Sequence, residues 1–171
     1  MIFPQFENVN VLDEIRAKYD PLASNVRPHI TLVFTFESNL TSIELKKHLE
    51  KVLTGISPFR LTMSEIIKMD NPLGMYLFLV VKEGIEDIKK LTSNLYTGIL
   101  EQYKPEWLNE KTFLPHMTIG NLTSRDDLNK AFQDVSVIKE SFTTVVKKVS
   151  VEIIDEKEDS IIDIEVDLSN Y

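Results

Sequence analysis

Apolar residues along this chain recur either every three to four positions or at every second position, which separates predicted helices from predicted strands. Residues 8–19 and 84–103 have the helical spacing, and shorter helices are predicted to begin at Thr41 and Ser124. Alternation, or a run of β-branched and apolar residues, predicts strands elsewhere. The predicted strands span residues 28–36, 59–69, 75–81, 113–122, 142–154 and 160–168.

Local signals mark where several of these elements begin and end. Thr41 and Glu44 have the spacing of a capping box, and Gly55 is a suitable stop for the same helix. Residues 70–74 have the Asn, Pro and Gly content of a tight turn between two strands. The acidic run at residues 155–159 is typical of a solvated hairpin turn.

The order of the predicted elements repeats, because each half of the chain reads helix, strand, helix, strand, strand. A repeated unit packs naturally about a pseudo-two-fold axis, so the pattern predicts an α+β protein of bilobal, duplicated form. Each lobe would be an antiparallel sheet flanked by helices, with a central groove between the lobes. We expect one domain, residues 1–171, with lobes built from residues 1–82 and 83–171.

A five-residue string occurs once in each half, in the equivalent predicted strand. Pro-His-Ile-Thr-Leu at residues 28–32 returns as Pro-His-Met-Thr-Ile at residues 115–119. Because side chains alternate between the two faces of a strand, the histidine and the threonine of each string should project together. A packed core has no need of such a string, so its recurrence predicts a functional site.

Four side chains of these strings suit chemistry at a phosphate. Histidine has an ordinary pKa of about 6.5, so one member of a pair can be neutral and the other protonated near neutral pH. His29 and His116 are therefore the candidate general base and general acid, and their roles are interchangeable at this level. Thr31 and Thr118 can donate hydrogen bonds to the non-bridging phosphate oxygens. Such a site needs no metal ion.

Other candidate residues have simpler interpretations. His48 lies among charged residues of the second predicted helix and is expected to be a solvated surface residue. Arg27 precedes the first histidine and could contact phosphate, although charged residues are common next to a strand. Three aromatic side chains could stack on a base but are expected to serve packing: Phe34, Tyr76 and Trp107.

Composition limits the partners. The 171 residues have a formal net charge of −8, whereas proteins held on nucleic acid through its phosphates usually have a basic face. We therefore expect no extended nucleic-acid-binding surface, and any nucleic-acid substrate to be short or bound at one end. The chain has no cysteine, which excludes disulfides and thiol nucleophiles. It has no apolar run of membrane-spanning length, so a cytoplasmic protein without membrane contact is expected.

The two His-x-Thr strings resemble those of the 2H phosphoesterase superfamily, which includes the 2′-5′ RNA ligase-like proteins. Residues 15–21, leading into residues 28–34, look particularly like the bacterial ligase-like members. The resemblance implies a bilobal fold with a central groove and RNA-processing chemistry without metal or cofactor. It implies action on 2′,3′-cyclic phosphates, 2′-5′ linkages or related cyclic nucleotides, with the two histidines as the acid/base pair and the two threonines as phosphate binders.

The chain departs from several RNA-processing members at one position. Those members resemble one another in an arginine three residues after the second threonine, where this chain has Asn121. A guanidinium binds phosphate through two parallel charge-assisted hydrogen bonds, which an amide does not provide. Together with the acidic net charge, this favours a small cyclic nucleotide or an RNA end as the substrate.

Two other functions are open at this level. A protein of the same fold could bind a nucleotide or an RNA end without turning it over. The histidines could instead be metal ligands, but no His-x-His or His-x-x-x-His pair accompanies them, and threonine is a poor ligand. The sequence gives no indication of the oligomeric state.

Overall fold

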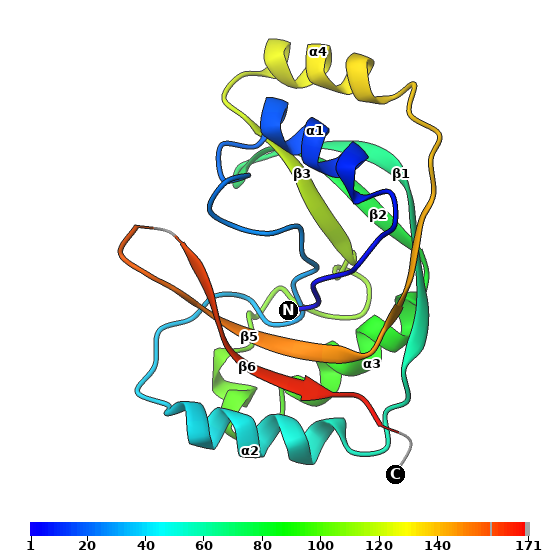
Figure 1. Ribbon diagram of the computed structural model, residues 1–171. Helices are drawn as coiled ribbons and strands as arrows, with labels where there is room; N and C mark the ends of the chain where they lie inside the picture. Colours follow the sequence, from blue (N-terminus) through cyan, green and yellow to red (C-terminus); the bar gives the residue numbers. More distant parts are fainter. Residues whose placement is uncertain (158, 170–171) are drawn as a thin grey trace.

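The computed structural model describes residues 1–157 and 159–169, which form two antiparallel sheets with helices behind them (Figure 1). In chain order the elements are α1 (Val9–Tyr19), α2 (Ser42–Leu53), β1 (Phe59–Asn71), β2 (Gly74–Glu83), α3 (Ile85–Leu95), the 3-10 helix η1 (Gly98–Tyr103), β3 (His116–Leu122), α4 (Arg125–Val135), β4 (Phe142–Val146), β5 (Lys148–Ile154) and β6 (Ser160–Asp167).

The larger sheet has four strands in the order β3-β2-β1-β4. One of its faces is apolar and almost closed to solvent, and includes Leu77, Leu79, Met117 and Ile119. Helices α1 and α4 cover this face with their own apolar stripes, and Figure 1 shows both helices on the same side of the sheet. Strand β1 is irregular near Glu65, whose φ is +69°, and the sheet curls along this strand.

The smaller sheet consists of β5 and β6, and the N-terminal residues extend it. Met1 exchanges two backbone hydrogen bonds with Ser150 of β5, at 2.8 and 3.0 Å. Ile2 exchanges two more with Ile30, both at 2.9 Å. Residues 1–3 therefore lie between β5 and the segment that contains the first histidine string. Helix α2 packs against β6 and α3 on the other side of this layer (Figure 1).

Several predicted boundaries are confirmed. Thr41 and Glu44 make both hydrogen bonds of the capping box at the start of α2. Ser124 caps α4, and a tight turn joins β1 to β2 as expected. The acidic run at residues 155–159 lies between β5 and β6, although Glu158 is outside the described residues.

The predicted strand over residues 28–36 is wrong. Among the described residues, Ile30 alone in this segment pairs with another one, as a single bridge to Ile2, because residues 1–3 are too short a neighbour to form a ladder. Further along, the backbone N–H of Phe34 donates to the hydroxyl of Tyr96 at 2.9 Å instead of to a neighbouring strand. The segment is extended and anchored at one point.

Two other elements are shorter than predicted. The predicted helix over residues 84–103 stops at Leu95, and η1 follows after a short turn, beginning at Gly98, whose φ of +53° is left-handed. The predicted strand over residues 142–154 is two strands in different sheets. The chain crosses from β4 in the larger sheet to β5 in the smaller one at Lys147.

The α+β class is as predicted, but the two layers are not the two halves of the sequence. The larger sheet combines β1 and β2 from residues 1–83 with β3 and β4 from the rest of the chain. The arrangement of strands also differs between the layers, since β3 pairs directly with β2 whereas residues 1–3 separate the first histidine string from β5. The structure therefore does not confirm the predicted duplication.

His48 is buried, and the prediction of a solvated surface residue is wrong. Its side chain is 8% exposed, and its Nε2–H donates to the carbonyl of Leu95 at 3.0 Å. This hydrogen bond connects α2 to the C-terminal end of α3. In the described part of the chain, no helix is long and apolar enough to cross a membrane.

Candidate active site

The second histidine string begins strand β3 and is positioned by its pairing with β2. His116 lies opposite Val80, and Thr118 lies opposite Phe78. The intervening Met117 is 0% exposed and faces the helices. His116 and Thr118 are partly exposed and project from the other face of the sheet. The expected alternation is present.

The first histidine string has the same alternation without a complete strand. Ile30 and Leu32 are 0% exposed and belong to the core. His29 and Thr31 lie on the opposite side of the backbone and are partly exposed. The bridge holds Ile30, which lies between His29 and Thr31, and so orients the segment that carries both side chains.

Both histidine rings are anchored in the same way. The Nδ1–H of His29 donates to the carbonyl of Arg27 at 2.9 Å. The Nδ1–H of His116 donates to the carbonyl of Leu114 at 2.7 Å. A carbonyl can only accept, so in each neutral ring Nδ1 carries the proton and Nε2 has the lone pair. In each string a proline stands between the histidine and its carbonyl partner, and its fixed φ helps to hold that carbonyl in place.

The consequence of this anchoring is chemical. Each Nε2 can accept a proton when its ring is neutral and donate one when its ring is charged. Across residues 1–157 and 159–169, neither Nε2 has a hydrogen-bond partner. Both atoms are therefore available to a ligand.

The two imidazoles act on each other electrostatically. Burial lowers the pKa of His116 below its ordinary value, and a positive charge on His29 lowers it further. Burial also lowers the pKa of His29, against the opposing effects of its hydrogen bond to Arg27 and the carboxylate of Glu152. Since two protonated rings repel one another, the pair takes up its protons in separate steps.

The two threonine hydroxyls are available as well. Neither Thr31 nor Thr118 donates to or accepts from another protein group in the part of the chain that the structure describes. Both are accessible to solvent, so an anion could take the place of water at each hydroxyl without breaking a protein hydrogen bond. The same described residues contain no group of three His, Asp or Glu side chains that could hold a metal ion.

Two phenylalanines that the sequence patterns did not identify support the histidine rings. Phe78 stacks on His116 with centroids 3.8 Å apart, and Tyr76 stacks on Phe78 at 5.5 Å. Phe3 lies beside His29 at 6.0 Å, tilted by 58°. The alternation of β2 places Tyr76 and Phe78 on one face, but only the register of β2 against β3 reveals that this is the face of His116.

A bulge in β3 brings Asn121 to the same face. Ile119 is an extra residue relative to β2, so the alternation shifts by one position beyond it. Asn121 pairs with Tyr76, which shares the face of Phe78 and Thr118. The position three residues after the second threonine therefore faces the histidine site, with a neutral amide.

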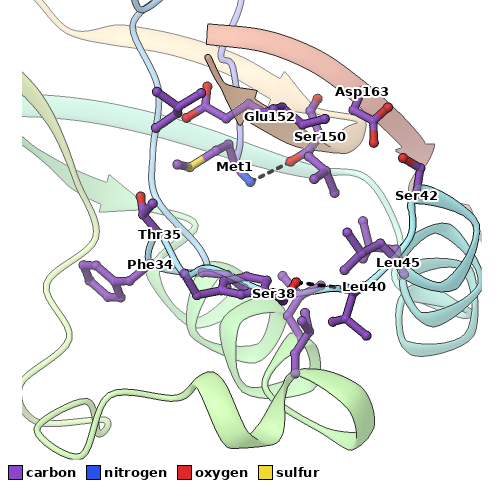
Figure 2. A pocket seen from close by; sticks show the side chains of 18 of the residues that line it. Met1, Phe34, Thr35, Ser38, Leu40, Ser42, Leu45, Ser150, Glu152 and Asp163 are labelled. Carbon is purple, nitrogen blue, oxygen red and sulfur yellow. Dashed lines mark hydrogen bonds between the residues drawn. The ribbon is translucent and has the colours of Figure 1, made fainter. Parts of the chain in front are cut away.

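A cavity of about 620 Å³ lies beside the first string, and the two histidines are not among its lining residues. One wall is the segment of residues 33–38 that continues from Thr31, and another is β5 (Figure 2). Leucines from α2 and α3 form its apolar side. Glu152, whose charge acts on His29, also lines it, so the cavity adjoins the histidine site. Its size suits a small molecule.

Comparisons with known proteins identify the family of this chain. Residues 4–158 match the 2′-5′ RNA ligase superfamily. A Bacillus licheniformis protein named "Putative phosphoesterase" is 27% identical over 128 residues, which are 74% of this chain and 72% of the relative. A Halalkalibacterium halodurans protein with the same designation is 30% identical over 132 residues, which are 75% of this chain and 71% of the relative.

A solved structure has the same fold. The crystal structure of TT0787 of Thermus thermophilus matches with a TM-score of 0.65 and 17% identity, over 98% of this chain and 94% of that chain. At this identity the likeness concerns the fold alone. The family match covers most of the sequence, and the chain belongs to the 2′-5′ RNA ligase superfamily of 2H phosphoesterases.

Proposed function

We propose that this protein is a metal-independent phosphoesterase that acts on a 2′,3′-cyclic phosphate, a 2′-5′ linkage or a related cyclic nucleotide. The observation that carries the proposal is the matched pair of imidazoles. Each is anchored through Nδ1 to a backbone carbonyl, and each leaves Nε2 without a partner among the described residues, on the face of its segment that also carries a threonine. Membership of the phosphoesterase family supports the reaction class.

The reaction requires two proton movements at one phosphorus. The neutral ring takes a proton from water through Nε2 while the water oxygen forms a bond to phosphorus. The protonated ring gives its Nε2 proton to the departing ribose oxygen as the phosphorus–oxygen bond breaks. The threonine hydroxyls donate to the non-bridging oxygens, where negative charge increases in the transition state. The two rings exchange protonation states in each turnover, and solvent restores the starting state.

The three histidines allow a matched test. Variants His29→Gln, His116→Gln and His48→Gln make the same substitution, but only the first two change the proposed site. We expect each of those two to lower kcat/KM by about 10²- to 10⁴-fold, because one proton transfer is lost. His48→Gln should retain activity, since the glutamine amide can still donate to Leu95. The assay uses 2′,3′-cyclic mononucleotides, oligonucleotides ending in a cyclic phosphate, and 2′-5′ dinucleotides, all with a chelator present.

A second candidate function is binding of a nucleotide or an RNA end without turnover. The cavity beside the first string favours it, because a small ligand could be held there away from both histidines. This alternative predicts nucleotide binding without product, and equal affinity in the wild type and the two site variants. Turnover that disappears in His29→Gln and His116→Gln would reject it, and turnover unchanged in both would reject the catalytic proposal.

A further inference from the structure

The surroundings of the two histidines differ in charge. On the His29 side, the guanidinium of Arg27 lies over the ring of Phe3 at 4.5 Å, and Phe3 in turn lies beside His29 at 6.0 Å. The guanidinium and the imidazole therefore both lie close to the ring of Phe3. The carbonyl of Arg27 also anchors His29, so the backbone at residue 27 is held relative to the ring.

Arg27 is exposed, and no carboxylate forms an ion pair with it in the described part of the chain. The positive charge of Arg27 helps to lower the pKa of Glu165 on β6, but Glu165 already pairs with Lys148 at 2.8 Å. These three charges and the carboxylate of Glu152, which acts on His29, sum to zero, so the His29 side is distinguished by an unpaired guanidinium and not by a net positive charge. Stacking on Phe3 limits the conformations of the arginine side chain without using its N–H donors, so the guanidinium can bind an anion.

Among the described residues the His116 side has no unpaired cation, because Lys82, which alternation places on the same face of β2, pairs with Glu65. The other neighbours of His116 on the same face are aromatic and aliphatic, since Phe78 stacks on the imidazole and pairs with Ile67. Tyr76 and Asn121 continue this face with neutral groups. A substrate that spans both histidines would therefore meet apolar surface on one side and an unpaired guanidinium on the other.

We propose that Arg27 binds a second phosphate of the substrate, so that the preferred substrate carries a phosphate next to the one at which the bond is broken. The inference rests on the proposed function and refines its substrate class. Because the guanidinium and the imidazole lie 4.5 and 6.0 Å from the centroid of the same Phe3 ring, one substrate can reach both groups. A nucleotide with a 5′-phosphate as well as a 2′,3′-cyclic phosphate is the smallest molecule with this arrangement, and an RNA end repeats it.

The test compares adenosine 2′,3′-cyclic phosphate with its 5′-phosphorylated form. In the wild type, kcat/KM should favour the 5′-phosphorylated substrate by about tenfold to a hundredfold, the usual effect of a hydrogen bond to a charged group. In Arg27→Gln this ratio should fall to near one, and in Arg27→Lys it should be intermediate, because lysine keeps the charge but not the two-pronged geometry. Arg125→Gln is the matched control, since Arg125 is 79% exposed, pairs with Asp70 and lies on α4, behind the opposite face of the sheet.

A wild-type ratio near one, or a ratio that survives in Arg27→Gln, would overturn the inference. A calorimetric comparison of adenosine 2′-monophosphate with adenosine 2′,5′-bisphosphate separates it from the proposed function. Tighter binding of the bisphosphate that depends on Arg27, without turnover of either cyclic substrate, would support the inference and reject the phosphoesterase proposal. Turnover of both cyclic substrates without a preference for the 5′-phosphorylated one would support the phosphoesterase proposal and reject the inference about Arg27. Equal binding of both nucleotides without turnover would reject the inference and the phosphoesterase proposal together.

Discussion

Replacing Thr118 by valine isolates the contribution of one hydroxyl at the proposed site. Valine keeps the β-branched shape that suits strand β3 and removes only the hydrogen-bonding group. The hydroxyl has no protein partner in the described structure, so its removal leaves no protein group unsatisfied. The free energy of unfolding should therefore change by less than about 0.5 kcal/mol, as for most surface substitutions.

The effect on catalysis should be much larger than the effect on stability. A hydrogen bond to a charged oxygen contributes about 1.5–3 kcal/mol, which corresponds to a loss of about 10- to 150-fold in kcat/KM. If the bond strengthens as charge develops on the phosphate, the loss should appear mainly in kcat. The measurement is the initial rate of hydrolysis of a 2′,3′-cyclic nucleotide, with urea unfolding of the same preparation.

Thr144→Val on β4 is the matched control, because Thr144 pairs with the fully buried Leu61 and so faces away from the histidine site. Its activity should equal that of the wild type. If Thr118→Val and Thr144→Val had the same kcat and KM, the hydroxyl of Thr118 would have no part in phosphate binding. A marked loss of stability in Thr118→Val would show that the hydroxyl has a structural role.

Three further predictions concern the histidines and their supports. Burial lowers the pKa of both His29 and His116, so the state in which one of the two rings is protonated should be most populated below pH 6.5. The pH profile of kcat/KM should therefore be bell-shaped with its maximum below pH 6.5. A maximum at pH 7.5 or above would contradict this assignment. Phe78→Leu removes the ring that stacks on His116. The loss of an aromatic contact of about 0.5–1.5 kcal/mol should lower kcat/KM about 2- to 12-fold. Unchanged kinetics would mean that the stack does not position the imidazole. His48→Ala leaves the Leu95 carbonyl without its buried donor and should lower the free energy of unfolding, measured by urea titration, by about 1–3 kcal/mol. The stability of His48→Gln should be closer to that of the wild type. Equal stability of all three proteins would contradict the role of this hydrogen bond.

Local sequence patterns predicted those parts of the fold that local interactions determine. The capping box of Thr41 and Glu44 depends on residues three apart, and the alternation around His116 depends on residues two apart. Both features are present. The pairing of segments depends on contacts between distant residues, and the sequence did not reveal that residues 1–3 would separate the first histidine string from β5.

The same distinction applies to the site. The two histidines and two threonines could be identified because their string repeats, and their roles are still predictions. The stack of Phe78 on His116 could not be predicted, because it depends on the register between β2 and β3. The burial of His48 was missed because its charged neighbours in sequence point to solvent while the imidazole faces α3. The free guanidinium of Arg27 was visible only as one charged residue beside a predicted strand.

The claim that both imidazoles bind one phosphate can be tested without knowing the substrate. Nitrogen-15 NMR of the labelled histidines reports each Nδ1 and Nε2 separately, and inorganic phosphate at constant pH serves as the ligand. We expect the Nε2 signals of His29 and His116 to shift together along one binding curve, while both Nδ1 signals remain those of protonated nitrogens and His48 does not respond. A shift at only one of the two rings, or two curves with different midpoints, would contradict a shared site.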